Sequence, residues 1–406
     1  MGIMKRLLYI IMPLLCFCGC IPPEEMLRNP VGSNAENSFK DIVIGAALPL
    51  SGKYAAQGSE MLPGAQAAVE TLNQKRGING RRVRLEICDT KSTPQGASLA
   101  MTSLAKKGAT VIIGGYSTVE TEGLCIGAQR ERVPLIVPCA TADEISTANA
   151  FVFRISCTDT QQAEGLAAYL WYWRQINQIG VLVDMRADSV YERNVARAVA
   201  QSFSDLGGYV AKTANYTDVP SCVDAMRTVM AAAPKAIVVS AMGEEAAMMV
   251  KALRKLGYTG VICGADGWDR DDFFFTLGTD FDPGECIYVT FFSNEYKDDE
   301  FTMFSEEFRK KFYHLPGAQA AAVRDAVFMA GSCIVNNADI RSFRRNWLAL
   351  QNYFGASSVY SPLRTGDVDR ILFINSVIPA GVRSKYPGPR LLRQFMHSKL
   401  ETYKFD

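Results

Sequence analysis

The segment between Ile42 and Gly80 constrains the fold of this chain more than any other. It begins with an apolar run, Ile42–Ala47, whose length and composition predict a buried strand. A loop containing proline, serine and glycine follows, and then a helical pattern with apolar positions Met61, Ala65, Ala68, Val69 and Leu72. A strand, a polar loop and a helix in this order form the unit of a parallel α/β sheet. In such sheets small ligands bind at the carboxyl ends of the strands, where these loops lie.

The same alternation of strands and helices recurs in two successive sets, which predicts two parallel sheets flanked by helices. Strands are expected at 83–88, 110–113, 135–137, 179–183, 209–213, 236–239, 261–263 and 287–290, with an extended crossover at 151–155. Helices are expected at 94–106, 120–130, 161–173, 192–206, 222–232, 244–256, 301–312, 319–335 and 342–354, before an extended region at 370–377. A chain of 406 residues also suits two domains better than one. The tail beyond Gly381 is expected to wrap the surface or fray.

Composition excludes several classes of function. The net charge is +1, so nucleic acid is not an expected partner. The only histidines are His314 and His397 and no CxxC pair occurs, so no zinc site and no His-based catalytic triad is expected. A phosphate-binding GxxxxGK[ST] loop is also missing from the sequence. We therefore expect neither a cofactor nor a metal nor an enzyme.

The first residues form a targeting signal. Lys5 and Arg6 precede the apolar run Leu7–Phe17, which is too short to span a membrane. The sequence Phe17-Cys18-Gly19-Cys20 resembles a bacterial lipoprotein box with Cys20 as the lipidated residue, although an ordinary cleaved signal peptide is the alternative. Residues 21–40 have no periodicity and read as a disordered tether.

Eight further cysteines follow the leader. An exported protein encounters conditions in which disulfides form. Most of these residues lie in apolar strands or helices, however, so buried free thiols are at least as expected as bridges. Pairing cannot be read from spacing alone for Cys88, Cys125, Cys139, Cys157, Cys222, Cys263, Cys286 and Cys333.

The pattern PLSG…G…GAQAAVE.LN…GING in the first segment resembles the start of the type I periplasmic substrate-binding proteins for branched-chain amino acids. The resemblance covers roughly Asp41 to Val377. It implies an α/β protein with two lobes, each a parallel sheet flanked by helices, joined by a three-strand hinge. The implied divisions are a lipoprotein signal peptide (1–19), a tether (20–40), lobe 1 (41–158 and 290–360), lobe 2 (159–289), and a last hinge crossing with the lobe 2 end and tail (361–406).

Two loops of lobe 1 carry the first candidate site residues. Gly114–Thr118 ends a strand and opens a helix, where free N–H groups and the hydroxyls of Ser117 and Thr118 favour an anion; a simple helix cap is the alternative. The next loop, Pro138–Thr141, resembles the family's P-x-A-T loop. The resemblance implies that Thr118 binds the α-carboxylate of an amino acid, that Cys139 or Ala140 offers backbone groups, and that Thr141 contacts both carboxylate and ammonium.

Lobe 2 carries the candidate partner for the ammonium group. Asp266, after the strand at 261–263, stands where the family has an acidic residue, and a carboxylate opposite an ammonium is a strong charge-assisted hydrogen bond. An Asp-Gly turn is the alternative. Trp268 either lines the mouth or packs in the loop. Tyr191 falls where the family has a cleft tyrosine.

Three positions depart from leucine-binding relatives. Gln57, Met242 and Gln319 stand where those relatives have aromatic contacts to the ligand side chain, so a larger or more polar side chain is an option. The resemblance implies a lipid-anchored extracytoplasmic binding protein, periplasmic or on the cell surface, that delivers an amino acid to an ABC-type permease. Alternatives are a sensor, a binder of amides, short peptides or aromatic acids, or an envelope component that binds nothing.

Overall fold

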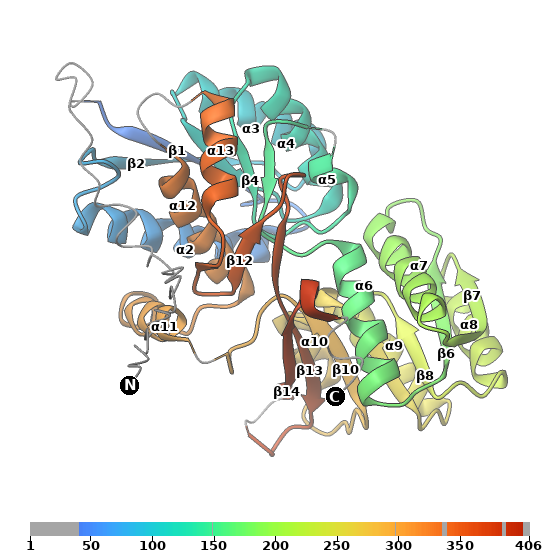
Figure 1. Ribbon diagram of the computed structural model, residues 1–406. Coiled ribbons are helices and arrows are strands. Elements are labelled where there is room, and N and C mark those ends of the chain that lie inside the picture. Colours follow the sequence, from blue (N-terminus) through green and yellow to red (C-terminus); the bar gives the residue numbers. More distant parts are fainter. Residues whose placement is uncertain (1–39, 148, 297, 335–338, 384–386, 401–406) are drawn as a thin grey trace, which may run out of the picture.

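The computed structural model describes residues 40–147, 149–296, 298–334, 339–383 and 387–400. The expected signal peptide, the tether and Cys20 lie outside these ranges. Figure 1 shows two α/β lobes side by side, with the blue to teal elements and orange helices in one and the green to yellow elements in the other.

The first lobe is built on a five-stranded, fully parallel sheet in the order β2-β1-β3-β4-β5. The strands are β1 (Ile42–Leu48), β2 (Val83–Asp89), β3 (Val111–Gly114), β4 (Leu135–Val137) and β5 (Val152–Arg154). The connecting helices are α2 (Ala55–Gln74), α3 (Pro94–Lys106), α4 (Thr118–Glu131) and the short α5 (Glu144–Thr147). Every residue of β1, β3 and β4 is buried, as expected for strands covered on both faces.

The second lobe has a mixed sheet. Its parallel part runs β7-β6-β8-β9-β10, made of β6 (Gln178–Asp184), β7 (Tyr209–Tyr216), β8 (Ala236–Val239), β9 (Val261–Gly264) and β10 (Cys286–Thr290). The helices are α6 (Asp159–Ala168) with a π-helical end η2 (Tyr169–Trp173), α7 (Val190–Asp205), α8 (Val219–Ala231), α9 (Gly243–Lys255), the 3₁₀ turn η3 (Asp266–Trp268) and α10 (Asp271–Leu277). The strand β13 (Val368–Ile378), in the region where a final extended segment was expected, pairs with β10 in antiparallel register and makes the sheet mixed at this edge.

After β10 the chain returns to the first lobe. The helices α11 (Asp299–Phe312), α12 (Ala318–Cys333) and α13 (Ile340–Ala349) follow, and α12 packs on α2. The strands β11 (Tyr353–Phe354) and β12 (Val359–Pro362) come next. The long strand β13 then pairs with β12 at its start and with β10 further along, so one strand joins both lobes.

The C-terminal segment differs from the prediction. Gly388–Met396 forms strand β14, which pairs with β13 in antiparallel register instead of fraying. Its Phe395 is buried and stacks on Trp173 at a centroid distance of 5.8 Å. The aromatic contact between Phe395 and Trp173 helps to hold β14 in place. The sequence pattern of this edge strand is weak by itself. The helix predicted to run to residue 354 ends at Ala349, because Tyr353 and Phe354 pair with β12.

The cysteines in the described part of the chain are all free thiols, buried or half-buried. This agrees with one of the two expected readings. Within the same residues, no helix has the length and apolar character needed to cross a membrane.

Candidate functional site

A polar cleft lies between the two lobes at the carboxyl ends of the strands. It holds about 930 Å³ of empty space, open solvent at its mouth included. The first lobe lines it with the loops after β1, β3 and β4 and with the start of α12. The second lobe contributes the loop before α7 and the segments after β8, β9 and β10. The position agrees with the rule that ligands of parallel sheets bind beyond the carboxyl strand ends.

The first wall is the amino end of α4. Ser117 is the N-cap, and its hydroxyl accepts a hydrogen bond from the Glu120 amide at 3.3 Å, so its side chain serves the helix. Thr118 is 8% exposed, and its hydroxyl has no hydrogen-bond partner among the described residues although it lines the cleft. A buried hydroxyl at a helix amino end is a suitable donor for an anion.

The second wall of the first lobe is the loop after β4. Cys139, Ala140 and Thr141 are buried and line the cleft. The carbonyl of Ala140 accepts from the Ser156 hydroxyl at 2.7 Å, and the carbonyl of Thr141 accepts from the Asp159 amide at 2.8 Å. Burial raises the pKa of Cys139 well above its ordinary value, so the thiol stays neutral.

The second lobe presents Asp266 to the cleft. The Tyr191 hydroxyl donates to Asp266 Oδ1 at 2.6 Å and accepts from the Gly267 amide at 3.0 Å. The Asp266 amide donates to Gln162 Oε1 at 3.1 Å. Burial raises the pKa of Asp266, while the hydrogen bond from Tyr191 opposes the rise. Because Asp266 forms no ion pair within the described residues, its charge is available to a cation in the cleft.

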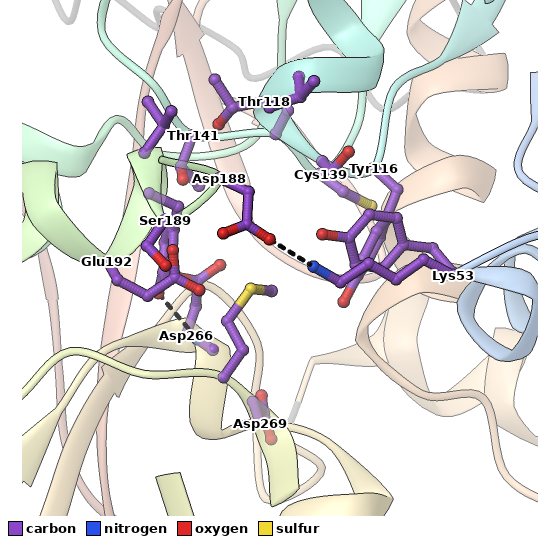
Figure 2. A pocket seen from close by; sticks show the side chains of 18 of the residues that line it. Lys53, Tyr116, Thr118, Cys139, Thr141, Asp188, Ser189, Glu192, Asp266 and Asp269 are labelled. Carbon is purple, nitrogen blue, oxygen red and sulfur yellow. Dashed lines mark hydrogen bonds and ion pairs between the residues drawn. The ribbon is translucent and has the colours of Figure 1, made fainter. Parts of the chain in front are cut away.

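Figure 2 shows how these groups converge. Thr118, Thr141 and Cys139 lie on one side of the cavity, and Asp266 and Asp269 on the other. Hydroxyl groups suited to a carboxylate therefore face a carboxylate suited to an ammonium. This is the arrangement that a zwitterion requires.

The positions predicted for side-chain recognition divide into two groups. Met242 and Gln319 line the cleft, whereas Gln57 and Trp268 do not. Trp268 is fully buried; its indole N–H donates to the Val239 carbonyl at 3.2 Å and its ring stacks on Phe273 at 5.0 Å. Trp268 is therefore a packing residue, which was one of its two expected roles.

Sequence reasoning missed several residues of the cleft. Asp159, close to this site, is 1% exposed, and neither carboxylate oxygen has a hydrogen-bond partner in the described structure. Burial raises its pKa to about 8. Its only sequence signal is the first turn of α6, where Thr158 and Gln161 form a capping box, and that pattern indicates a helix start and not a site. The residues that line the cleft and that sequence reasoning missed include Lys53, Tyr54, Tyr116, Arg186, Asp188, Glu192, Asp269 and Phe291.

Among the residues that the structure describes, a hydrogen bond and an ion pair cross the cleft. Arg270 Nη1 of the second lobe donates to the Tyr116 hydroxyl of the first at 3.0 Å. Lys53 Nζ pairs with Asp188 at 3.9 Å, and both side chains are largely exposed. The two lobes therefore touch each other across the cavity in this structure. Among the residues described, no group of three His, Cys, Asp or Glu side chains is placed to hold a metal ion.

Two α/β lobes that enclose a polar cavity define a two-lobed binding protein. The chain belongs to the periplasmic binding protein family, whose sequence model matches residues 41–336. That is a family of binding proteins, in agreement with the expectation that the chain is not an enzyme.

Curated relatives are distant. The Leu/Ile/Val-binding protein homolog 3 of Brucella melitensis is 24% identical over 60% of this chain and 66% of its own length. The Leu/Ile/Val-binding protein BraC3 of Rhizobium johnstonii is 28% identical over 59% of this chain and 65% of its own length. The chain thus matches just under two thirds of the length of these relatives.

Solved structures share the fold. The leucine-binding protein LivK of Thermotoga maritima has a TM-score of 0.75 at 22% identity, with 87% of this chain and 98% of that chain covered. The substrate-binding protein LivJ of Streptococcus pneumoniae, solved with isoleucine, has a TM-score of 0.74 at 21% identity, with 88% and 99% covered. These similarities confirm the predicted fold class.

Proposed function

We propose that this protein is an extracytoplasmic binding protein that captures an amino acid, branched-chain or related, and delivers it to an ABC-type permease. One observation carries the proposal: the free, buried Thr118 hydroxyl and the unpaired Asp266 carboxylate line the same cavity from opposite lobes. The relatives are named as a Leu/Ile/Val-binding protein and as a homolog of one, and these names support the same class of ligand.

In this proposal each lobe holds one end of the zwitterion. Thr118 and Thr141 bind the α-carboxylate, while Asp266, oriented by Tyr191, binds the α-ammonium. Cys139 and Ala140 contribute backbone groups. Because the two lobes share the ligand, binding favours the closed arrangement, and a permease distinguishes loaded from empty protein by the closed outer surface.

The proposal is tested by calorimetry on purified protein with the common amino acids, their amides and small carboxylates. Asp266→Asn keeps the side-chain shape but removes the charge, and we expect it to weaken amino-acid binding by about 2–5 kcal/mol, the cost of orphaning a buried charge. Asp280→Asn, at an exposed loop position, is the matched control and is expected to bind normally. Undiminished affinity in Asp266→Asn would refute the ammonium role. Binding of amine-free acids or amides alone would favour the alternative ligand classes.

We also propose that Cys20 carries a lipid anchor, as the leader sequence suggests. A cysteine that carries two or more acyl chains attaches a protein to a membrane without a spanning helix. In bacterial cells, Cys20→Ala is expected to move the protein from the membrane fraction to the soluble fraction. Unchanged fractionation would contradict the anchor but leave ligand binding untouched.

A further inference from the structure

The charges around the cleft do not balance. Within the described part of the chain, the cationic residues that line it are Lys53 and Arg186, and Arg270 reaches across it to Tyr116. Arg186 is held by Asp184 and by Glu245, the latter at 2.6 Å, and Lys53 pairs with Asp188. Three lining carboxylates, Asp266, Asp269 and Glu192, form no ion pair within the described structure. An amino acid's α-ammonium satisfies one of these carboxylates and leaves the others without a cation.

Asp269 is the most firmly oriented of the remaining carboxylates. Thr290 Oγ1 donates to its Oδ2 at 2.9 Å, and the Tyr288 hydroxyl donates to its Oδ1 at 3.3 Å. Both donors come from β10 and fix the carboxylate at the cleft wall (Figure 2). Its neighbour Arg270 is directed elsewhere, to Asp272 at 2.9 Å and to Tyr116 across the cleft. Nothing in the described protein therefore neutralises Asp269.

The first lobe also places an acidic residue, Glu60, near this part of the cleft. Gln319 lines the cleft at the start of α12. With its amide nitrogen turned toward Glu60, it donates to both carboxylate oxygens of Glu60, at 2.7 and 3.0 Å. Burial, followed by repulsion from Asp271 and Asp269, raises the pKa of Glu60 to about 7. Burial raises the pKa of Asp269 to about 7 as well, with Asp266 and Asp271 adding to the rise. Burial is the first cause of both rises, and for Glu60 the charge of Arg270 opposes the rise in pKa.

We propose that the cleft is built for a dibasic amino acid, whose side-chain cation lies between Asp269 and the Gln319–Glu60 pair while Asp266 holds the α-ammonium. This proposal rests on the proposed amino-acid-binding function. It has support besides the acidic residues, because the buried, unpartnered Thr118 hydroxyl lines the same cavity and marks the carboxylate end.

Two apolar residues of the cleft suit the aliphatic part of the side chain of such a ligand. Met242 and Phe291 contribute apolar surface to the cavity. A lysine-like side chain places its methylene groups against apolar atoms and its charge at a polar end. A purely aliphatic ligand would instead leave the buried Asp269 carboxylate with hydrogen bonds from Thr290 and Tyr288 but without a cation, which is costly.

The decisive experiment compares ligands that differ only in the side-chain charge. Calorimetry on the wild-type protein at pH 7.5 would use L-lysine against L-norleucine and L-arginine against L-citrulline. We expect each cationic ligand to bind at least tenfold more tightly than its neutral counterpart. Asp269→Asn should reduce that ratio at least fivefold, whereas Asp224→Asn, on the exposed face of α8, should leave it unchanged.

The outcomes separate this inference from the function on which it rests. If norleucine or another neutral amino acid binds as tightly as lysine, and Asp266→Asn abolishes that binding, the dibasic ligand is refuted and the amino-acid-binding function stands. If no amino acid binds, both are refuted. The wild-type comparison needs no variant, so it decides the matter even if Asp269→Asn does not fold.

Discussion

At the scale of single residues, the cost of buried carboxyl groups is clearest at Glu120. It is fully buried on α4, accepts a hydrogen bond from the Thr90 hydroxyl through Oε1, and has no partner for Oε2 in the described structure. Burial raises the pKa of Glu120 to about 6, and the charge of Asp89 adds to this while the Thr90 hydrogen bond opposes it. The folded protein therefore holds the proton of Glu120 more firmly than the unfolded chain, in which the pKa of this group is near 4.5.

The consequence is a pH-dependent stability. Because the folded pKa lies above the unfolded one, the free energy of unfolding falls as the pH rises from below 4.5 to above 6, by about 2 kcal/mol in total for this group. Glu120→Gln removes the titration, and urea denaturation of this variant between pH 4.5 and 7 should lack that part of the slope. Glu122→Gln, exposed on the same helix, should retain the wild-type slope. If the free energy of unfolding changes equally with pH in the wild type, Glu120→Gln and Glu122→Gln, the role assigned to Glu120 is contradicted.

At the scale of elements, the helix pair α2 and α12 sets one wall of the cleft. Gly64 of α2 lies against the backbone of α12, where an added Cβ would come within 2.3 Å of the Ala320 carbonyl oxygen. The glycine permits this close approach, which places Gln319, the neighbour of Ala320, at the cavity. A small residue at a helix crossing thus acts on the site through packing.

Gly64→Ala tests this contact. Overpacking costs about 1–3 kcal/mol, which should exceed the up to about 1 kcal/mol that alanine gains over glycine inside a helix. The melting temperature should therefore fall. Gln66→Ala, on the exposed face of α2, controls for helix propensity and should change stability by less than about 0.5 kcal/mol. A higher melting temperature for Gly64→Ala would show that the helices separate without cost.

At the scale of the whole molecule, the two lobes are connected by strands and held together by side chains across the cleft. Strand β13 pairs with elements of both lobes, so relative motion of the lobes must bend this connection. The Arg270–Tyr116 hydrogen bond and the Lys53–Asp188 pair span the cavity. The first is half-buried and directional, whereas the second is exposed and contributes little.

Tyr116→Phe removes the hydroxyl that accepts from Arg270 and leaves the ring in place. A hydrogen bond to a charged group contributes about 1.5–3 kcal/mol, so the ligand-free protein should shift toward more open forms. Small-angle X-ray scattering should show a larger radius of gyration than for the wild type. Tyr209→Phe, on an exposed β7 position, should scatter like the wild type. Identical curves for Tyr116→Phe would mean that this contact does not hold the lobes together.

The sequence by itself determined the order of most strands and helices up to β10, because continuous apolar runs and amphipathic patterns are local signals. It also located Thr118, Thr141, Tyr191 and Asp266, since each follows directly on a strand or opens a helix in a family-like motif. Their contact with a ligand remains a prediction.

Only the tertiary structure decided what depends on distant partners. Strand β14 exists because β13 offers it an edge, and Trp268 packs in the core because Phe273 and Val239 receive it. The unpaired charge of Asp269 is equally invisible in sequence, since it depends on where Arg270 and Arg186 point. Local patterns therefore determine the elements and the motif residues, whereas the balance of charges in the cleft follows from the way the lobes bring separate loops together.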